Sequence, residues 1–156
     1  MEIIIRKGGI FMQGKIINRD NALFLAFAAA FIAMAGSLYF SEIKGYEPCV
    51  LCWYQRIVMY PFTVIFVIAI WKKDYHIAIY TIVLSAIGIC ISTYHVLIQK
   101  VSFFTERAAS CGRIPCTGDY INWLGFITIP MLALTAFIII FACSLYIFKV
   151  SKGETK

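Results

Sequence analysis

Four long stretches of apolar residues limit the folds that are open to this chain. Each has few or no charged residues and reaches or approaches the roughly 20 residues that a helix needs to cross ~30 Å of hydrocarbon. A soluble domain is about half apolar, whereas 62% of these 156 residues are hydrophobic. We therefore predict an all-α membrane protein with one domain over residues 1–156. Its approximate spans are 22–40, 53–71, 77–98 and 123–148.

The basic residues predict how these helices are oriented. Cytoplasmic segments of membrane proteins carry an excess of Lys and Arg. If the N-terminus is cytoplasmic, nine of the 14 basic residues fall inside and five fall outside. We therefore expect an antiparallel four-helix transmembrane bundle with both termini in the cytoplasm. The net charge of +6 then reflects topology, because the basic residues form no contiguous patch of the kind that binds nucleic acid.

Six cysteines are a high count for such a protein. Cys90 and Cys143 fall inside the third and fourth apolar stretches, where a free cysteine is most simply a small apolar core residue. The other four lie in segments assigned to the outside, where paired thiols meet an oxidising environment and form disulfides. These pairs are Cys49 with Cys52, and Cys111 with Cys116.

The first pair has the C-x-x-C spacing of a redox-active disulfide. A ring closed over two residues constrains the unfolded chain very little, so stabilisation is a poor reason to have one. The pair follows Pro48, a residue favoured near helix starts, and the positive end of a helix dipole stabilises a thiolate. Arg56 comes one helical turn after Cys52, on the same face. An arginine just inside a bilayer is a candidate functional residue, although it could also snorkel to the headgroups.

His95 lies near the outer end of the third stretch, at a depth that should match that of Arg56. Two polar groups at one depth beside a cysteine pair could flank a quinone head group. A histidine that simply satisfies its hydrogen bonds at the interface is the alternative. The residues from Gln99 to Ser110 alternate apolar and charged side chains, a weak indication of a short helix on the membrane surface.

Other interpretations of the cysteines remain open at this point. The four paired cysteines could form a four-sulfur zinc site, or two inert structural disulfides. Covalent haem is excluded, because it needs a histidine directly after the second cysteine of the C-x-x-C, and Trp53 occupies that position.

The segment from Pro48 to Arg56 reads PCVLCWYQR, which resembles the signature of DsbB-type disulfide bond formation proteins. The resemblance continues through His95-x-x-x-Gln99, then Trp123-Leu124-Gly125 and Pro130, and so covers almost the whole chain past residue 20. Only four residues separate the second cysteine pair, as in the BdbC-like branch, whereas the enterobacterial branch has a wide separation. Gln55 stands where many relatives have glutamate, so we assign no role to that position.

The resemblance implies a thiol:quinone oxidoreductase of the bacterial cell membrane that supports disulfide formation in exported proteins. Cys111 and Cys116 resemble the pair that oxidises a soluble thioredoxin-fold partner of the DsbA or BdbD type. Cys111 would form the mixed disulfide, and Cys116 would be regenerated through Cys49.

The same resemblance implies that Cys52 passes the electrons to a quinone, either ubiquinone or menaquinone. Arg56 would hold the quinone, and His95 resembles a residue on the quinone side. A protein like vitamin K epoxide reductase is the rival with the same chemistry, but its C-x-x-C would fall near the final helices, whereas this one opens the second.

Overall fold

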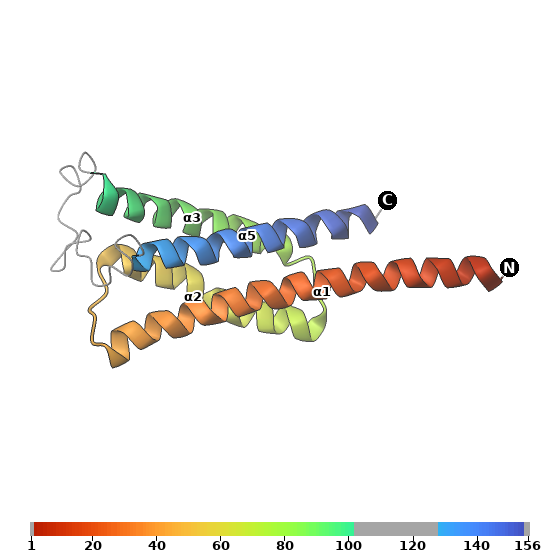
Figure 1. The fold of residues 1–156 in the computed structure, drawn as a ribbon, viewed down its shortest axis with the longest axis horizontal. Helices are drawn as coiled ribbons and strands as arrows, with labels where there is room; N and C mark the ends of the chain where they lie inside the picture. Colours follow the sequence, from red (N-terminus) through yellow and green to blue (C-terminus); the bar gives the residue numbers. More distant parts are fainter. Residues whose placement is uncertain (1, 102–127, 155–156) are drawn as a thin grey trace.

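The computed structural model of the chain describes residues 2–101 and 128–154. All the regular secondary structure in these residues is helical (Figure 1). A short π-helix, η1 (Tyr39–Ile43), directly continues the first long helix. The four long helices are α1 (Glu2–Leu38), α2 (Val50–Lys72), α3 (Ala78–Lys100) and α5 (Ile129–Glu154).

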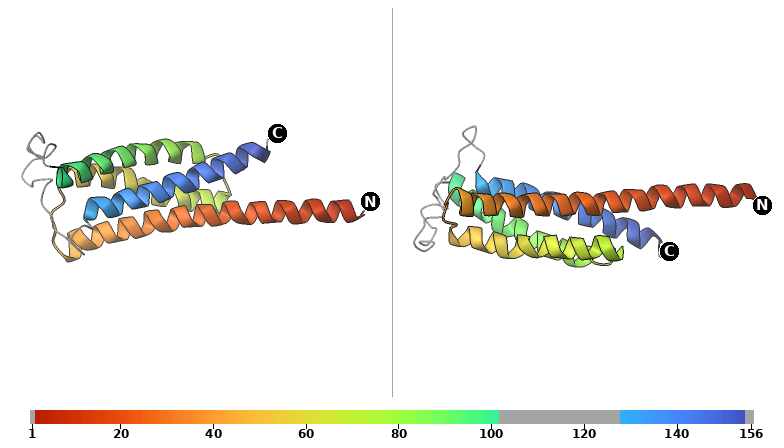
Figure 2. Two further views of the ribbon diagram at one scale, coloured as in Figure 1. Left: turned by 45° about the horizontal axis from the view of Figure 1, so that its top comes forward. Right: turned by 90° about the horizontal axis from the view of Figure 1, so that it is seen from below.

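The long helices lie side by side along one axis (Figure 1). The helices α2 and α5 begin at the end of the bundle where α1 and α3 finish. Helix α1 packs on α2 and α5, and α3 packs on α5 and α2. The first helix extends beyond the others toward its N-terminus, and both chain ends lie on that side (Figure 2).

Each long helix contains a segment that is long and apolar enough to cross a membrane. The outer surface of the bundle is also apolar, with exposed fractions of 69% for Ile32, 64% for Ile57 and 59% for Val83. Water would penalise such a surface, whereas lipid favours it. The chain therefore has the architecture of a multi-pass membrane protein. The spanning segments are Arg19–Ile43, Val50–Lys72, Ala78–Lys100 and Ile129–Gly153.

The helices begin and end at places that differ from the predicted spans. Helix α1 starts at Glu2, well before the predicted residue 22, and α2 starts three residues earlier than predicted, so that Cys52 lies in its first turn. Helix α5 continues to Glu154, while residues 123–127 of the fourth predicted span lie outside the described residues. The assignment of the chain to a single domain remains a prediction.

Aromatic rings and small residues form the core between the helices. The rings of Phe62 and Phe66 stack at 5.6 Å, and Phe137 of α5 meets Phe62 edge-on at 6.4 Å. Gly88 of α3 faces Phe137 so closely that any Cβ at position 88 would collide with the ring. Small residues at helix contacts let backbones approach, which is how apolar helices associate in lipid.

The two cysteines inside helices have different surroundings. Cys143 lies in the core of the bundle, as predicted. Cys90 is exposed on α3, so the prediction that it is a core residue is wrong. In a helix that is apolar on all sides, the sequence does not indicate which side faces the protein.

At the end of the bundle near the chain termini, α1 is fastened to the turn between α2 and α3. The Tyr75 hydroxyl donates a hydrogen bond of 2.5 Å to Asp20 Oδ1, and the guanidinium of Arg19 lies 4.5 Å from the centre of the Tyr75 ring. We call Arg19, Asp20 and Tyr75 the fastening cluster.

Candidate functional site

The C-x-x-C pair lies at the start of α2, at the opposite end of the bundle from the fastening cluster. Cys49 is the N-cap residue of α2 and has extended backbone angles (φ −67°, ψ 168°). Its Sγ accepts a hydrogen bond of 3.4 Å from the backbone N–H of Cys52. A side chain that accepts from the first turn satisfies an N–H group that the helix itself leaves unpaired. The cap thus brings the two cysteine side chains together.

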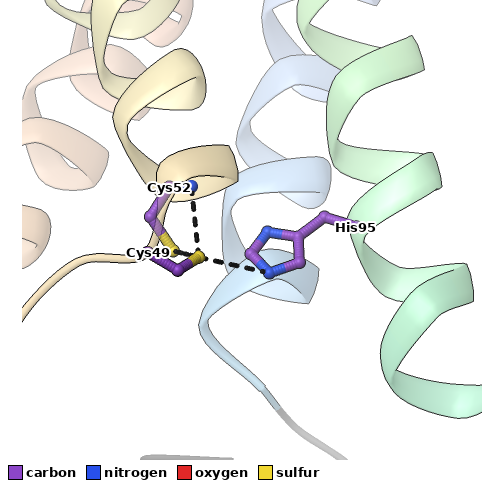
Figure 3. Close-up of side chains that lie close together, drawn as sticks. All are labelled: Cys49, Cys52 and His95. Carbon is purple, nitrogen blue, oxygen red and sulfur yellow. Dashed lines mark hydrogen bonds between the residues drawn. The ribbon is translucent and has the colours of Figure 1, made fainter. Parts of the chain in front are cut away.

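The two sulfurs are free thiols 3.0 Å apart, with the Cys49 thiol donating to Cys52 Sγ (Figure 3). Cys49 is buried and Cys52 is partly exposed. A disulfide bond is about 2.05 Å long, so a small movement of the side chains would close the pair. The geometry therefore suits reversible oxidation.

His95 projects from α3 toward the same pair (Figure 3). Its Nε2 lies 3.7 Å from Cys49 Sγ, and its Nδ1 lies 3.3 Å from Nε2 of Gln55. His95 is only 1% exposed and Gln55 only 5%. The hydrogen bond to Cys52 and burial raise the pKa of the Cys49 thiol to about 12, although the contact with His95 opposes the rise.

Arg56 is held inside the bundle between α1 and α2. Its Nη2 donates a 3.0 Å hydrogen bond to the carbonyl oxygen of Ser37, and its guanidinium lies 5.4 Å from the centre of the Trp53 ring. Ser37 lies in the last turn of α1, which η1 continues to Ile43. This contact holds the guanidinium against α1, an arrangement that snorkelling alone does not explain.

A cavity of about 410 Å³ opens beside these residues. Cys49, Cys52, Arg56 and His95 all line it. Most of its remaining wall is apolar and comes from α1, α2 and α5, including Ala29, Ala33, Met59, Leu132, Ala136 and Phe137. Ligand pockets of this size are commonly apolar with a few polar groups that orient the ligand.

Two hydroxyl groups in the cavity wall have no hydrogen-bond partner among the residues that the structure describes. These are the buried hydroxyls of Tyr60 and Thr128. Buried polar groups are nearly always paired, so an unpaired one needs an explanation. Tyr60 follows Arg56 by one helical turn, so Cys52, Arg56 and Tyr60 form one row along α2. The unpaired hydroxyls could donate to a ligand in the cavity.

The structure thus brings together the four predicted site residues that it describes: Cys49, Cys52, Arg56 and His95. Cys111 and Cys116 lie outside the described residues, as does most of the predicted surface helix, while Gln99 and Lys100 belong to α3.

The sequence analysis missed Gln55, Tyr60 and Thr128, which also belong to the site. Helical spacing from Cys52 and Arg56 could have identified Tyr60. Gln55 was set aside because of the departure from the family pattern, yet it is buried against His95.

A metal ion is a further possibility for the same side chains. The ligand atoms of Cys49, Cys52 and His95 lie within 4.8 Å of one another. Thiolate and imidazole ligands suit zinc, which usually takes four ligands in structural sites. The described residues supply three, and the four-sulfur site that the sequence left open as an alternative involves residues outside them.

Comparisons with known proteins identify the family. The family model for disulfide bond formation protein DsbB matches residues 19–147. The chain belongs to the DsbB family. Membership of this family implies disulfide oxidoreductase activity and excludes the rival assignment to a protein like vitamin K epoxide reductase.

Relatives within the DsbB family agree with the predicted branch. The chain is 58% identical over 137 residues to the probable disulfide formation protein C 1 of Bacillus anthracis, covering 88% of this chain and 99% of the relative. It is 51% identical over 139 residues to the disulfide bond formation protein C of Bacillus subtilis, covering 88% and 96%. No solved structure matches the chain.

Proposed function

We propose that this DsbB-family protein is a thiol:quinone oxidoreductase that reoxidises a thioredoxin-fold thiol oxidase outside the cytoplasm. The observation that carries the proposal is that a close cysteine pair and a guanidinium line one apolar cavity inside a membrane bundle. A quinone is a lipid-soluble acceptor, so a site that reduces it must be reachable from the membrane.

The cavity fits the head group of a quinone. Its wall is mainly apolar, and Arg56 and the unpaired hydroxyl of Tyr60 supply donors for carbonyl oxygens. A bound quinone would accept two electrons and two protons. Arg56 would hold it, and His95 lies near enough to line the same space.

The electrons would pass through both cysteine pairs by thiol–disulfide exchange. The dithiol of the partner reduces the Cys111–Cys116 disulfide, Cys111 forming the mixed disulfide, and the partner leaves oxidised. The new dithiol then reduces the Cys49–Cys52 disulfide, with Cys116 regenerated through Cys49. Oxidation of the Cys49–Cys52 dithiol releases two electrons and two protons to the quinone, and the chain returns to its starting state.

The orientation that this reaction needs is the predicted one, an antiparallel bundle with both termini in the cytoplasm of a bacterial cell. A membrane-impermeant thiol reagent applied to intact, reduced cells should modify Cys111 and Cys116. Modification only after permeabilisation would reverse the topology and remove the partner from reach.

The activity is tested with purified protein, a reduced thioredoxin-fold oxidase and soluble analogues of ubiquinone and menaquinone. We expect catalytic loss of the quinone absorbance with one of the analogues, matched by disulfide formation in the partner. Stable binding of zinc, with thiols that remain reduced in the presence of quinone, would favour a metal site at Cys49, Cys52 and His95 instead.

A further inference from the structure

The helix α5 begins in the cavity wall with a threonine that precedes its first residue. The carbonyl oxygen of Thr128 accepts hydrogen bonds of 3.0 Å and 3.2 Å from the N–H groups of Met131 and Leu132. The helix itself starts at Ile129. The residue whose carbonyl accepts the first bonds of a helix is its N-cap. Thr128 is therefore the N-cap residue of α5.

The hydroxyl of Thr128 does not cap the helix. An N-cap threonine normally uses its hydroxyl oxygen to accept from the second or third N–H of the helix. The second residue here is Pro130, which has no N–H, and the N–H of the third, Met131, is bonded to the Thr128 carbonyl. The hydroxyl has no hydrogen-bond partner within residues 2–101 and 128–154, although Thr128 is only 2% exposed. Its proton is therefore available to a ligand in the cavity.

Thr128 lies on a different wall of the cavity from Arg56. Arg56 and Tyr60 belong to one row on α2, whereas Thr128 lines the cavity at the start of α5. Both helices begin at this end of the bundle (Figure 1), but they pack mainly on α1 and α3 and only slightly on each other. A ligand in the cavity can therefore receive hydrogen bonds from two helices that have little direct contact.

We propose that Thr128 is a quinone-binding residue that donates a hydrogen bond to one ring oxygen of a para-quinone, while Arg56 donates to the other. The two oxygens of a para-quinone point in opposite directions, so they are best held by donors on two walls. A quinone held in this way links α5 to α2. The inference rests on the proposed function and adds a residue from the fourth spanning helix to the site.

The electrostatics at the start of α5 favour an oxygen atom of the ligand at this position. The N-terminal end of a helix carries a partial positive charge. The first turn of α5 contains no acidic residue that would offset it. Negative charge develops on the oxygens of a quinone as electrons reach its ring, and donors placed where charge develops stabilise it. The helix end therefore suits an acceptor oxygen beside Thr128.

The unused cap is tested without any ligand. Thr128→Val keeps the shape of the side chain and removes its hydroxyl. Because a buried hydroxyl without a partner costs free energy, the melting temperature of the purified protein should stay the same or rise. A hydroxyl that caps α5 predicts a marked fall instead. Such a fall, or failure of the variant to fold, would overturn the proposal.

The second oxygen of the ligand is tested with two probes. Duroquinone has two opposed ring oxygens, and its methyl groups leave no ring position at which a thiol could add. Isophorone has a ring of the same size with a single oxygen. Binding is measured to protein with oxidised cysteine pairs, so that no electrons are transferred.

Thr128→Val should weaken the binding of duroquinone about three- to tenfold, as expected for one hydrogen bond between neutral groups. The binding of isophorone should not change, because its one oxygen stays with Arg56, the charged and stronger donor. Arg56→Met should weaken the binding of both probes. Unchanged binding of duroquinone to Thr128→Val, or an equal loss for both probes, would contradict the proposal.

Two control variants separate the hydroxyl from the shape of the wall. Thr128→Ser keeps the hydroxyl and should bind duroquinone nearly as the wild type does. Thr135 of α5 also lines the cavity, but its hydroxyl already donates a 2.9 Å hydrogen bond to the carbonyl oxygen of Met131. Thr135→Val should therefore leave the affinity for both probes unchanged. If either control loses as much affinity as Thr128→Val, the hydroxyl of Thr128 is not the cause.

The outcomes for Thr128 and for the proposed function can be told apart. If the wild type reduces duroquinone and Thr128→Val binds it equally well, the function stands and Thr128 has no part in the site. If duroquinone binds through Thr128 but takes no electrons from the reduced cysteine pair, Thr128 stands and the function fails. A wild-type protein that does not bind duroquinone would overturn the assignment of Thr128, whatever its activity with other quinones.

Discussion

Both ends of this apolar bundle carry a buried or half-buried arginine, but the two arginines have different surroundings. Arg19 is 7% exposed and stacks on Tyr75, whose hydroxyl is bonded to Asp20. Arg56 bonds to a helix carbonyl and also lines a cavity, in which the hydroxyl of Tyr60 has no partner among the described residues. The contacts among Arg19, Asp20 and Tyr75 fasten α1 to the turn between α2 and α3. Polar groups that face a cavity can bind a ligand.

Substitutions at the cysteine pair should reduce turnover of the partner far more than substitutions in the fastening cluster, and this is the largest expected difference between the two ends. Cys52→Ser should oxidise at most one equivalent of partner through Cys111 and Cys116 and then stop, because no dithiol remains to reduce the acceptor. Cys111→Ser should fail to oxidise the partner while still binding a quinone analogue. Partner disulfide counted over many turnovers measures both effects. Asp20→Asn, in the fastening cluster, should turn over normally, and normal turnover by Cys52→Ser would show that the electron route is wrong.

The next largest difference is expected between the two arginines, in their effect on the KM for a quinone analogue. Arg56→Met should raise the apparent KM for a quinone analogue about 10- to 100-fold, because a hydrogen bond to a charged group contributes about 1.5–3 kcal/mol. Arg56→Lys should be intermediate, since lysine keeps the charge but loses the planar array of donors. Reaction with the thiol partner should change little in either variant.

Arg19→Met is the matched control for this prediction. It should lower the melting temperature and leave the quinone KM unchanged. If Arg56→Met instead lowered only stability and membrane insertion, Arg56 would belong with Arg19 as a structural residue.

The two tyrosines sharpen the comparison further. Tyr60→Phe should raise the quinone KM about 3- to 10-fold, the effect of one neutral hydrogen bond of about 1 kcal/mol. Thermal stability should not fall, because the hydroxyl has no hydrogen-bond partner within residues 2–101 and 128–154. Tyr75→Phe should do the reverse, lowering the melting temperature through loss of the bond to Asp20 and leaving KM alone. Equal effects of the two variants on KM would remove the distinction.

The isolated cysteines should have the smallest effects. Cys90→Ala and Cys143→Ala, together, should keep full turnover, since neither thiol has a partner cysteine nearby in the described residues. Cys143→Ala should lower the melting temperature slightly because it leaves a small gap in the core. Cys90→Ala should leave the melting temperature unchanged, because Cys90 is exposed. A tenfold loss of turnover at a normal protein level would reveal a third redox centre.

The sequence predicted the helices and the cysteine pair because both depend on local pattern. Length and hydropathy alone locate a spanning helix, and C-x-x-C spacing brings two sulfurs together on one turn. The sequence did not indicate which face of each helix is inside, because lipid and protein interior are both apolar and the usual amphipathic periodicity is absent. The rotation of each helix about its own axis decides which of its faces is inside. It therefore decides that Cys90 is exposed and that Tyr60 lies in the cavity wall.

The contact between His95 and the cysteine pair depends on how two helices, α2 and α3, are each rotated about their own axes. Matching depth indicated that His95 and Arg56 lie at one level, but depth does not say which neighbour the imidazole touches. The structure pairs it with Cys49 and Gln55. A position that departed from the family pattern, Gln55, was set aside for that reason, although its burial makes it part of the site.

The most direct test of the account is whether the Cys49–Cys52 pair alone can reduce a quinone. The Cys111→Ser/Cys116→Ser protein, fully reduced and kept free of oxygen, is mixed with one equivalent of a soluble quinone analogue. We predict that one equivalent of quinone is reduced and that peptide mass spectrometry finds a disulfide between Cys49 and Cys52. Cysteines that remain reduced, beside a quinone that binds but keeps its oxidised spectrum, would contradict the account.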